Sequence, residues 1–517
     1  MVEVPNCSKR HEVGPLQDHC GIMGVYYPNA EGRYFQEMLN NLEENNGFPF
    51  MALQTRGYDG AGFWTLGQDG TTTEHRAPGA ISEAFSSHVL TQYADTPGRI
   101  VVLQNRYGTN GSASIDNLQP AIGRHFPTGE EVAVAHNGQF SLGEEQEIAN
   151  ESDTYVYLRE LTQAEGDDWD QRIVNSLWSK RGAYSLIIGT SFGMYLARDP
   201  KGIRPLSYGL RPDGTWIAAS ETAALEMEGI TEFLEVMPGE VVRIDDGGPN
   251  TVHKFETDGH TAACSFENVY VAGEPTRVHA ERESPDQINH AITIYEMRRN
   301  SGFVLAREAP VTMDERGLVV GIPGTAIPGG EAYAEALGLT YRQIVKDRQP
   351  NNERTFMSAD LERIYGNLLT HFTFDAESIE GRDITIVDDS IVRGNVSGVL
   401  VELLKTVYGA KSVHLRVLSP PIDKPCHLGV NTRTSEELIA ARHSNNVDLI
   451  ARELGVDSLG YLSVDGLIES ITKSRTGKGL CTGCMAGGQH PIDRHGDTIP
   501  PVSTPVPPIR LYTRAHA

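Results

Sequence analysis

The sequence predicts two domains, a layered and β-rich α+β domain followed by an α/β domain built on an open parallel sheet. A chain of 517 residues is too long for one hydrophobic core. From Cys20 to about Cys264, short β-branched runs such as "RIVVLQNRY" and "YSLIIGT" alternate with Gly, Asp and Pro turns, which is typical of a layered β-rich domain. After about residue 285, apolar strands such as "GLVVGIP" and "SVHLRVLS" alternate with helix-length segments, which indicates a parallel sheet.

The composition excludes several classes of protein. Hydrophobic residues make up 39% and charged residues 22% of the chain, as expected for a soluble globular protein. The formal net charge of −25 disfavours nucleic acid as a partner, because Lys and Arg drive binding to its backbone. The sequence contains no apolar run of about 18 residues, so no membrane span is predicted, and residues 1–19 lack the apolar core of a secretory signal. We therefore expect a cytoplasmic protein with no membrane partner.

The first domain begins at Cys20, which lies in the stretch "LQDHCGIMGVYY". This cysteine comes directly before a glycine and an apolar, strand-like run, and it follows a polar tail or leader of residues 1–19. An inert strand residue, a metal ligand and a nucleophile all fit this position. The local sequence does not decide among them.

The second domain contains a candidate phosphate-binding loop in "DITIVDDSIVRGNVSGVLVELLKTVYG", residues 383–409. An apolar strand runs into Asp388 and Asp389, a loop passes through Arg393 and Gly394, and a helix begins near Ser397. Such a loop directs backbone N–H groups and a helix N-terminus at a phosphate, while carboxylates at the strand end can hold ribose hydroxyls. An ordinary strand–turn–helix with Asp as the N-cap is the alternative.

The string "DDSIVRG" resembles the phosphoribosyl-diphosphate loop of type I phosphoribosyltransferases, in the version found in glutamine phosphoribosyl-diphosphate amidotransferases. The first half carries segments similar to those of the same family, in family order: "CGIMGV", "LQTRGYDGAG", "NRYGTNGS", "AHNGQ" and "ESDTYV". The resemblance extends from Cys20 to Cys484. It implies an N-terminal-nucleophile glutaminase domain with layered αββα architecture, joined to a type I phosphoribosyltransferase domain with an open parallel sheet.

The resemblance also implies how the chain is divided. Residues 1–19 are expected to be a propeptide. Residues 20–264 are expected to form the glutaminase domain, and residues 265–475 the phosphoribosyltransferase-type domain. Residues 476–517 form a C-terminal segment that contains two cysteines and a proline-rich tail.

The family assigns roles to residues of the first domain. Cys20 is the nucleophile, and its free α-amino group is the base, so that cleavage between His19 and Cys20 is expected. Asn137 and Gly138 supply the two donors of an oxyanion hole. The glutamine substrate is held by Arg106 at its carboxylate and Asp153 at its ammonium group, with Arg56 and Tyr107 as supporting groups.

The family likewise assigns phosphoribosyl-binding residues in the second domain, and Mg²⁺ bound through the substrate at Asp388 and Asp389. These residues are Asp388, Asp389, Ser390, Arg393, Gly394, Asn395 and Ser397, together with Lys346, Arg348 and Arg354 of a lengthened closing loop. The chain departs from the family at Asn395 and Val396, where two threonines are usual, at "PGTA" (323–326) and at "HFT" from His371. We therefore consider two acceptors, phosphoribosyl diphosphate itself or a related activated sugar phosphate.

Four further cysteines, Cys264, Cys426, Cys481 and Cys484, remain after Cys20 is assigned. A single C-x-x-C such as "CTGC" is compatible with zinc, redox chemistry or a cluster. The sequences around all four match the cysteines that hold a [4Fe–4S] cluster in one branch of the family, and four thiolates suit such a cluster. A tetrahedral zinc ion bound by the same cysteines is the alternative.

The leading functional hypothesis is an amidophosphoribosyltransferase. It hydrolyses glutamine and uses the ammonia to displace diphosphate from phosphoribosyl diphosphate, giving 5-phosphoribosylamine. A sugar-phosphate isomerising aminotransferase or an asparagine synthetase would need a different second half. A regulatory homologue with a disabled synthase half is the third hypothesis. The family implies a homo-oligomer, either a dimer or a tetramer, that purine nucleotides inhibit.

Overall fold

We describe the protein from a computed structural model. The structure describes residues 20–44, 46–106, 117–141, 152–257, 259–280, 282–347, 372–430, 432, 434–472, 479–493, 495, 497–499 and 512–513. The predicted cleavage site at His19, together with Tyr107, Arg348, Arg354 and His371, lies outside these ranges.

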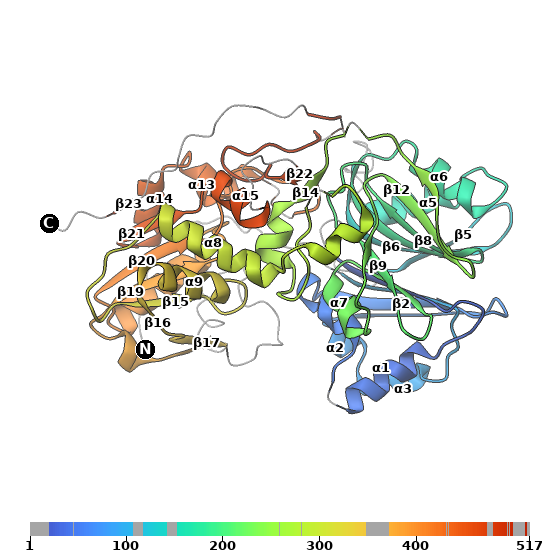
Figure 1. The fold of residues 1–517 in the computed structure, drawn as a ribbon, viewed down its shortest axis with the longest axis horizontal. Coiled ribbons are helices and arrows are strands. Elements are labelled where there is room, and N and C mark those ends of the chain that lie inside the picture. Colours follow the sequence, from blue (N-terminus) through green and yellow to red (C-terminus); the bar gives the residue numbers. More distant parts are fainter. Residues whose placement is uncertain are drawn as a thin grey trace.

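Two stacked β-sheets form the centre of the first half (Figure 1). The first sheet has the order β11 (Leu234–Glu235), β9 (Ser207–Leu210), β10 (Trp216–Ala219), β1 (Gly21–Tyr26), β4 (Ile100–Arg106), β2 (Gly60–Leu66) and β3 (Thr72–Pro78). The second has the order β13 (Gly248–Lys254), β12 (Glu240–Asp245), β8 (Gly193–Arg198), β7 (Gly182–Thr190), β6 (Glu131–Phe140) and β5 (Ala121–Arg124). Every residue of β1, β4 and β7 is buried, because both faces of these strands are covered.

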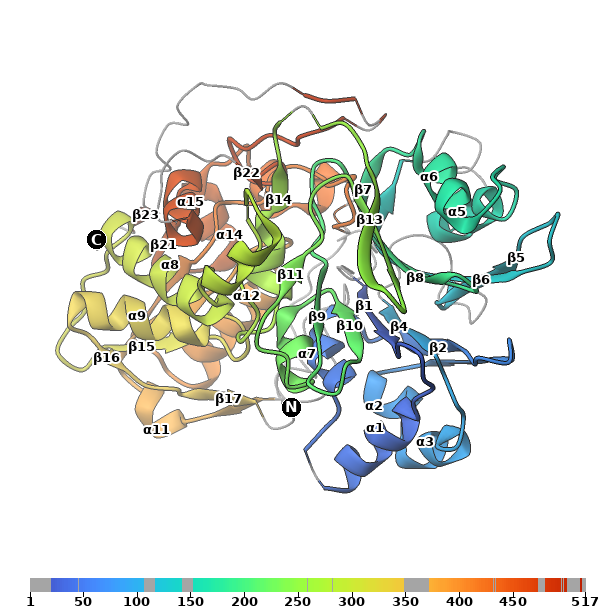
Figure 2. The same cartoon turned by 45° about the vertical axis from the view of Figure 1, so that its right-hand side comes forward.

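Helices cover the outer faces of both sheets (Figure 2). Against the first sheet lie α1 (Tyr34–Glu43), η1 (Pro49–Arg56), α2 (Ile81–Ala84), α3 (Ser87–Tyr93) and α7 (Thr222–Met227), and against the second lie α5 (Asp153–Leu161) and α6 (Trp169–Leu177). Between the sheets, side chains such as Trp64, Val102 and Ile187 form a separate core. This is the layered αββα arrangement that the family resemblance predicted.

The second half is built on a largely parallel sheet. Its order is β16 (Thr340–Tyr341), β15 (Leu318–Gly321), β19 (Asp383–Asp388), β20 (Ser412–Val417), β21 (Ser458–Tyr461) and an antiparallel β23 (Tyr512–Thr513). The strand sequences "LVVG", "DITIVD" and "SVHLRV" are almost wholly buried, as expected where helices cover both faces of a parallel sheet.

Two groups of helices cover this sheet. On one face α8 (Ile294–Glu308) packs against α9 (Ile327–Leu337) and α15 (Val464–Thr472). The other group contains α12 (Asn395–Glu402), α13 (Ile439–Arg442) and α14 (Val447–Leu454), which contact one another. The chain moves from β15 to β16 in one direction and from β19 to β20 and β21 in the other, so that the strand order reverses between β15 and β19. Ligands of such sheets bind at this reversal, outside the carboxyl ends of the strands.

The two halves meet at a short parallel pair of strands, β14 (Ala262–Cys264) and β22 (Gly479–Cys481), which lies between the large sheets in both views (Figures 1 and 2). The short helix η3 (Glu267–Val271) follows β14 and contacts α8. The predicted fold class, a glutaminase-type layered domain joined to a phosphoribosyltransferase-type sheet, is therefore confirmed.

Candidate functional site

Strand register in the first sheet places Cys20 beside Arg106. In the antiparallel pair β1–β4, Gly21 lies opposite Asn105. The residue before Gly21 is Cys20 and the residue after Asn105 is Arg106, so these two are neighbours across the sheet. Cys20 is partly exposed and Arg106 is buried. A thiol at the accessible end of a strand, next to a guanidinium, is well placed to meet an anionic substrate.

Asn137 and Gly138 lie in β6 of the second sheet, and an inter-sheet contact brings them to the same place. Gln104, two residues before Arg106, donates to the carbonyl oxygen of His136 (2.9 Å) and accepts from the N–H of His136 (3.1 Å). These bonds fix the end of β4 against β6, one residue before Asn137. The oxyanion-hole candidates and Cys20 thus lie at one end of the two-sheet sandwich.

The side chain of Asn137 is fully buried. Within the part of the chain that the structure describes, neither its Nδ2 nor its Oδ1 has a hydrogen-bond partner. A buried amide of this kind costs free energy unless a ligand satisfies it. Gly138 has a φ of +141°, and a Cβ there would fall 2.0 Å from the carbonyl oxygen of Ala183, so that only glycine fits. Both features agree with a site that holds an oxyanion.

Asp153 begins α5 and is buried. One carboxylate oxygen accepts from the backbone N–H of Phe140 (2.8 Å) and the other from the N–H of Thr154 (2.8 Å). Because Phe140 is two residues after Gly138, these bonds hold the carboxylate beside the oxyanion-hole candidates. The predicted glutamine-binding pair, Arg106 and Asp153, therefore comes from the ends of adjacent elements around Cys20.

Arg56, predicted as a supporting group, has a different environment from the other glutaminase residues. It is fully buried, and its Nε donates to the carbonyl oxygen of Cys20 (3.4 Å). Its Nη1 pairs with Glu221 at 2.7 Å and its Nη2 with Glu267 at 2.5 Å. Sequence reasoning missed both glutamates, since they lie 165 and 211 residues from Arg56 along the chain.

In the second half, Asp388 and Asp389 end β19 next to the turn that follows β15. Gly321 of β15 pairs with Val387 of β19 in parallel register, so both chain segments leave the sheet at the same edge. Asp389 accepts hydrogen bonds from the hydroxyl groups of Ser390 (2.7 Å) and Thr325. Burial and the adjacent charge of Asp389 raise the pKa of Asp388 well above its ordinary value.

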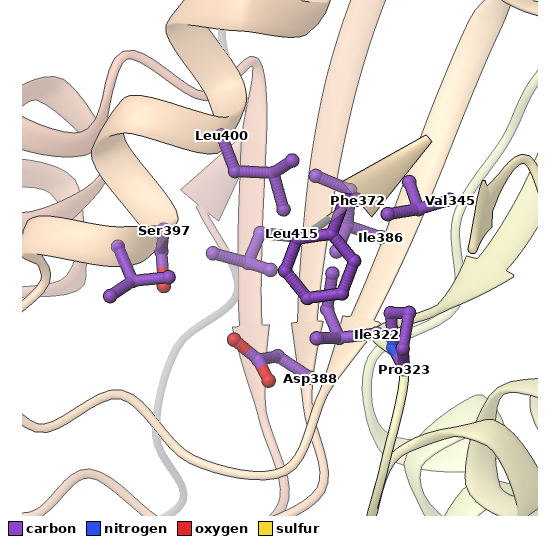
Figure 3. A pocket seen from close by; sticks show the side chains of 10 residues that line it. Ile322, Pro323, Val345, Phe372, Ile386, Asp388, Ser397, Leu400 and Leu415 are labelled. Carbon is purple, nitrogen blue, oxygen red and sulfur yellow. The ribbon is translucent and has the colours of Figure 1, made fainter. Parts of the chain in front are cut away.

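A small cavity opens at this edge (Figure 3). Asp388 and Ser397 lie on one side of it, and apolar side chains such as Phe372, Leu400 and Leu415 line the rest. Val396, which stands where the family has a threonine, also lines it. The cavity thus combines one acidic, hydroxyl-bearing wall with an apolar wall.

The raised pKa of Asp388 has two opposite consequences that can be measured. The ionised carboxylate, the form that is predicted to bind magnesium and hydroxyls, appears only as the pH rises through this raised value. The KM for phosphoribosyl diphosphate, measured with magnesium present, should therefore fall as the pH rises above the ordinary aspartate range. Ionisation in the folded state also costs stability at higher pH. We expect Asp388→Asn to raise the apparent melting temperature at neutral pH and to abolish diphosphate release. A lower melting temperature would contradict this.

Gly394 and Arg393 shape the loop that precedes α12. Gly394 has a φ of +82° and is the N-cap of α12, and a Cβ there would lie 2.6 Å from Ile439. Asn395 and Ser397 lie in the first turn of α12, where backbone N–H groups lack partners within the helix. The Arg393 guanidinium donates twice to the buried carboxylate of Glu437, from Nε at 3.0 Å and from Nη2 at 2.5 Å. Its predicted contact with the phosphoribosyl group stays a prediction.

Glu437, a residue that sequence reasoning missed, should control the phosphate loop. In Glu437→Gln, Arg393 loses its charged partner, and breaking a buried pair costs about 3–5 kcal/mol. We expect the KM for phosphoribosyl diphosphate to rise about tenfold or more, with glutamine hydrolysis unchanged. Steady-state kinetics of both half-reactions measure this. The control is Glu453→Gln, which removes a more exposed pair with Arg442 (2.6 Å) and should change little. Equal effects of the two variants would refute the role of Glu437.

Lys346 lies in β17 (Val345–Asp347), which pairs with β18 (Phe372–Phe374), and its side chain is exposed. The structure places β17 at the start of the predicted closing loop. The other cations of that loop, Arg348 and Arg354, lie outside the described residues, as does Tyr107 of the glutaminase site.

Cys264, Cys426, Cys481 and Cys484 come together at the junction of the halves. Cys264 lies opposite Cys481 in the β14–β22 pair. The carbonyl oxygen of Cys484 accepts from the N–H groups of Asp423 and Lys424, just before Cys426. Burial, and then the charges of Cys426, Cys264 and Cys481, raise the pKa of Cys484. Such mutual charge effects require the four thiols to be close to one another.

The donor set suits a thiolate-bound group. All four side chains are cysteines, and burial raises the pKa of Cys264 to about 12, against the opposing charge of Arg204. Four thiols, three of them buried and Cys426 partly buried, can ionise together only if a cationic group compensates them, as iron in a cluster does. Among the described residues, no group of three or more His, Cys, Asp or Glu side chains has the spacing for a single metal ion.

Comparisons with known proteins agree with this geometry. A family model described as "Glutamine amidotransferase domain" matches residues 130–227. The chain is 34% identical to an amidophosphoribosyltransferase of Synechococcus elongatus, covering 92% of each chain. It is 32% identical to that of Bacillus subtilis, covering 95% of this chain and 98% of the relative. None of the described helices combines the length and apolar character that a membrane crossing requires.

Solved structures give the same result. A glutamine phosphoribosylpyrophosphate amidotransferase from B. subtilis, complexed with ADP and GMP, matches with a TM-score of 0.75 and 31% identity, covering 93% of this chain and 99% of the other. A structure described as the allosteric regulatory enzyme of purine biosynthesis matches with a TM-score of 0.76 and 30% identity, covering 93% and 98%. With relatives above 30% identity that align along nearly the whole chain, this protein belongs to the amidophosphoribosyltransferase family.

Proposed function

We propose that the chain is a glutamine-dependent amidophosphoribosyltransferase. Residues 20–264 hydrolyse glutamine, and ammonia passes internally to residues 265–475, where it displaces diphosphate from phosphoribosyl diphosphate to give 5-phosphoribosylamine. This is the first step of purine synthesis. The observation that carries the proposal is the buried amide of Asn137, which has no hydrogen-bond partner among the described residues, at the end of the sandwich where Cys20 lies. Family membership supports the overall reaction.

The glutaminase step follows from the chemistry of these groups. The Cys20 thiol attacks the side-chain amide of glutamine, and the free α-amino group of Cys20, with an ordinary pKa near 8, accepts the proton. The negative charge that develops on the amide oxygen is held by Asn137 Nδ2 and the Gly138 N–H. Arg106 and Asp153 orient the substrate through its carboxylate and ammonium groups.

This mechanism requires removal of residues 1–19, since only then is the α-amino group of Cys20 free. We propose that these residues are a propeptide, cleaved between His19 and Cys20. Intact-mass measurement of purified active protein should give a chain that begins at Cys20. Active material that consisted only of chains beginning at Met1 or Val2 would overturn this part of the proposal.

We propose that Cys264, Cys426, Cys481 and Cys484 hold a [4Fe–4S] cluster in a structural role. The convergence of four cysteines, three of them buried, at the domain junction supports this. When bound, the cluster supplies a crosslink between β14, the segment around Cys426 and the segment 476–517. Protein purified without oxygen should be brown and contain about four irons per chain. Colourless protein with about one zinc and no iron would favour the zinc alternative.

The acceptor site is the part where the chain departs from its family. We propose that Asp388 and Asp389 hold ribose hydroxyls, and magnesium through the substrate, and that the N–H groups of α12 hold the 5-phosphate. Val396 and the apolar wall of the cavity are the reason for a second hypothesis, in which the acceptor is a related activated sugar phosphate. Diphosphate release from phosphoribosyl diphosphate and magnesium, with glutamine and then with ammonia, tests this. Glutamine hydrolysis without diphosphate release would favour the second acceptor or a regulatory homologue.

We further propose a cytoplasmic homo-oligomer, either a dimer or a tetramer, as the family implies. The relative from B. subtilis was solved with ADP and GMP, which supports inhibition of this chain by purine nucleotides. Light scattering coupled to size-exclusion chromatography measures the oligomeric state. Diphosphate release with and without GMP measures the inhibition.

A further inference from the structure

Four buried charges of alternating sign form a chain between the two halves. Glu221 pairs with Arg56 (2.7 Å), Arg56 with Glu267 (2.5 Å) and Glu267 with Arg204 (2.9 Å). None of the four side chains is more than 2% exposed. Two cations and two anions balance, which offsets part of the cost of removing them from water. Each member needs its neighbours, because removing any one of the four leaves a buried charge without compensation. The four side chains therefore hold one another in a single arrangement.

Arg56, the second member of this chain, contacts the nucleophile. The Nε of Arg56 donates to the backbone carbonyl of Cys20 (3.4 Å), so the guanidinium fixes the position of the residue that must attack glutamine. The neighbouring Glu221 is itself fixed, since it accepts from the N–H of Gly273 (2.9 Å) and the hydroxyl of Thr276 (2.7 Å).

The other end, Arg204, belongs to the first half and contacts a segment of the second half next to the oxyanion hole. The Nη2 of Arg204 donates to the carbonyl oxygen of Leu428 (2.5 Å). The next residue, Gly429, has a φ of +103° and packs so closely that a Cβ there would lie 2.6 Å from Arg204 and 3.3 Å from the backbone carbon of Gly138. The segment from Leu428 to Gly429 therefore touches both the charge chain and the oxyanion-hole glycine.

Glu267 occupies the central position, because its two oxygens hold the two arginines separately, Oε2 with Arg56 and Oε1 with Arg204. We propose that Glu267 is a positioning residue for glutamine hydrolysis, which holds Arg56 against Cys20 and Arg204 against the Leu428 segment. Because Glu267 acts on Cys20 through Arg56, its effect should be on the chemical step. The inference rests on the proposed function.

The test is Glu267→Gln in the full-length protein, which keeps the shape of the side chain and removes its charge. A misplacement of the nucleophile by about 1 Å costs on the order of a hundredfold. We expect kcat for glutamine hydrolysis to fall between about tenfold and a hundredfold, with the KM for glutamine changed by less than about threefold. Diphosphate release with ammonia should stay within about twofold of the wild-type rate.

The matched control is Glu235→Gln. Glu235 is equally buried at the same junction and pairs with Arg198 (2.9 Å), Arg282 (3.1 Å) and His279 (2.7 Å). It should leave kcat for glutamine hydrolysis largely unchanged. If Glu235→Gln lowers this kcat as much as Glu267→Gln does, or if Glu267→Gln raises KM without lowering kcat, the inference is overturned.

A double variant distinguishes a loss of nucleophile positioning from a loss of folding stability. It also keeps the test decisive if Glu267→Gln folds poorly. Combining Glu267→Gln with Arg204→Gln restores the balance of buried charge, with one cation and one anion left. We expect the double variant to melt at a higher temperature than Glu267→Gln and still to hydrolyse glutamine slowly. Recovery of wild-type kcat would show a purely structural role. Absence of glutamine hydrolysis by the wild-type protein would instead overturn the proposed function, and this inference with it.

Discussion

Cys20→Ala should lower kcat for glutamine hydrolysis by at least about ten-thousand-fold, as removal of a nucleophile does in other covalent hydrolases. The variant has no thiol at residue 20 to form the covalent intermediate, and the oxyanion hole alone retains only the weaker part of catalysis. Release of glutamate from glutamine, measured on protein whose N-terminus has been determined by mass spectrometry, gives the result directly.

Diphosphate release with ammonia is the internal control for this variant. The phosphate loop after β19 belongs to a different sheet and does not use the Cys20 thiol. We expect Cys20→Ala to keep this activity within about twofold of wild type. Continued glutamate release by Cys20→Ala would contradict the nucleophile assignment, and a parallel loss of both activities would indicate misfolding.

Asn137→Ala should lower kcat for glutamine hydrolysis by about a hundredfold to a thousandfold, the loss seen when one oxyanion-hole donor is removed. The KM for glutamine should change little, because the amide oxygen gains most of its charge only in the transition state. Stability should not fall by the amount usual for a buried amide, since Asn137 has no hydrogen bond to lose among the described residues.

Asn289→Ala provides the matched control. Asn289 is a partly buried asparagine outside the proposed site, and its Nδ2 donates to the carbonyl oxygen of Phe233 (3.0 Å) while its Oδ1 accepts from the N–H of the same residue. We expect this variant to lose stability and keep its kcat, the opposite pattern to Asn137→Ala. If both variants lose stability and neither loses kcat, Asn137 is a structural residue only.

Sequence patterns predicted a layered β-rich domain and an open parallel sheet, and the family resemblance added the αββα order of the layers. Strands such as β19 and β20 are continuous apolar runs between helix-length segments, and strands such as β4 and β7 are β-branched and bounded by turns. These signals are local, so periodicity alone reports them. The positions of Cys20, Asn137 and Asp388 followed from short motifs, because each lies at the end of, or within, a strand whose sequence is itself recognisable.

The buried ion pairs could not be predicted from the sequence. Glu267 and Arg204 are 63 residues apart, and Glu437 is 44 residues from Arg393. A lone Glu or Arg in a sequence usually denotes a solvated surface charge. Only the fold shows that each of these side chains is buried and which partner it meets. The same reason explains Val396, whose position against the cavity wall depends on how α12 packs on the sheet.

The β14–β22 pair has a consequence for folding. Ser265, next to Cys264, donates to the carbonyl oxygen of Cys481 across 216 residues of sequence (2.7 Å), so both ends of the second domain leave from one point. Closing so long a loop is slow in an unfolded chain and raises contact order. A group that joins Cys264 to Cys481 would remove about 5 kcal/mol of loop-closure entropy from the unfolded ensemble. With such a group in place, the second domain could not unfold independently, because the link between Cys264 and Cys481 at the junction would have to break first.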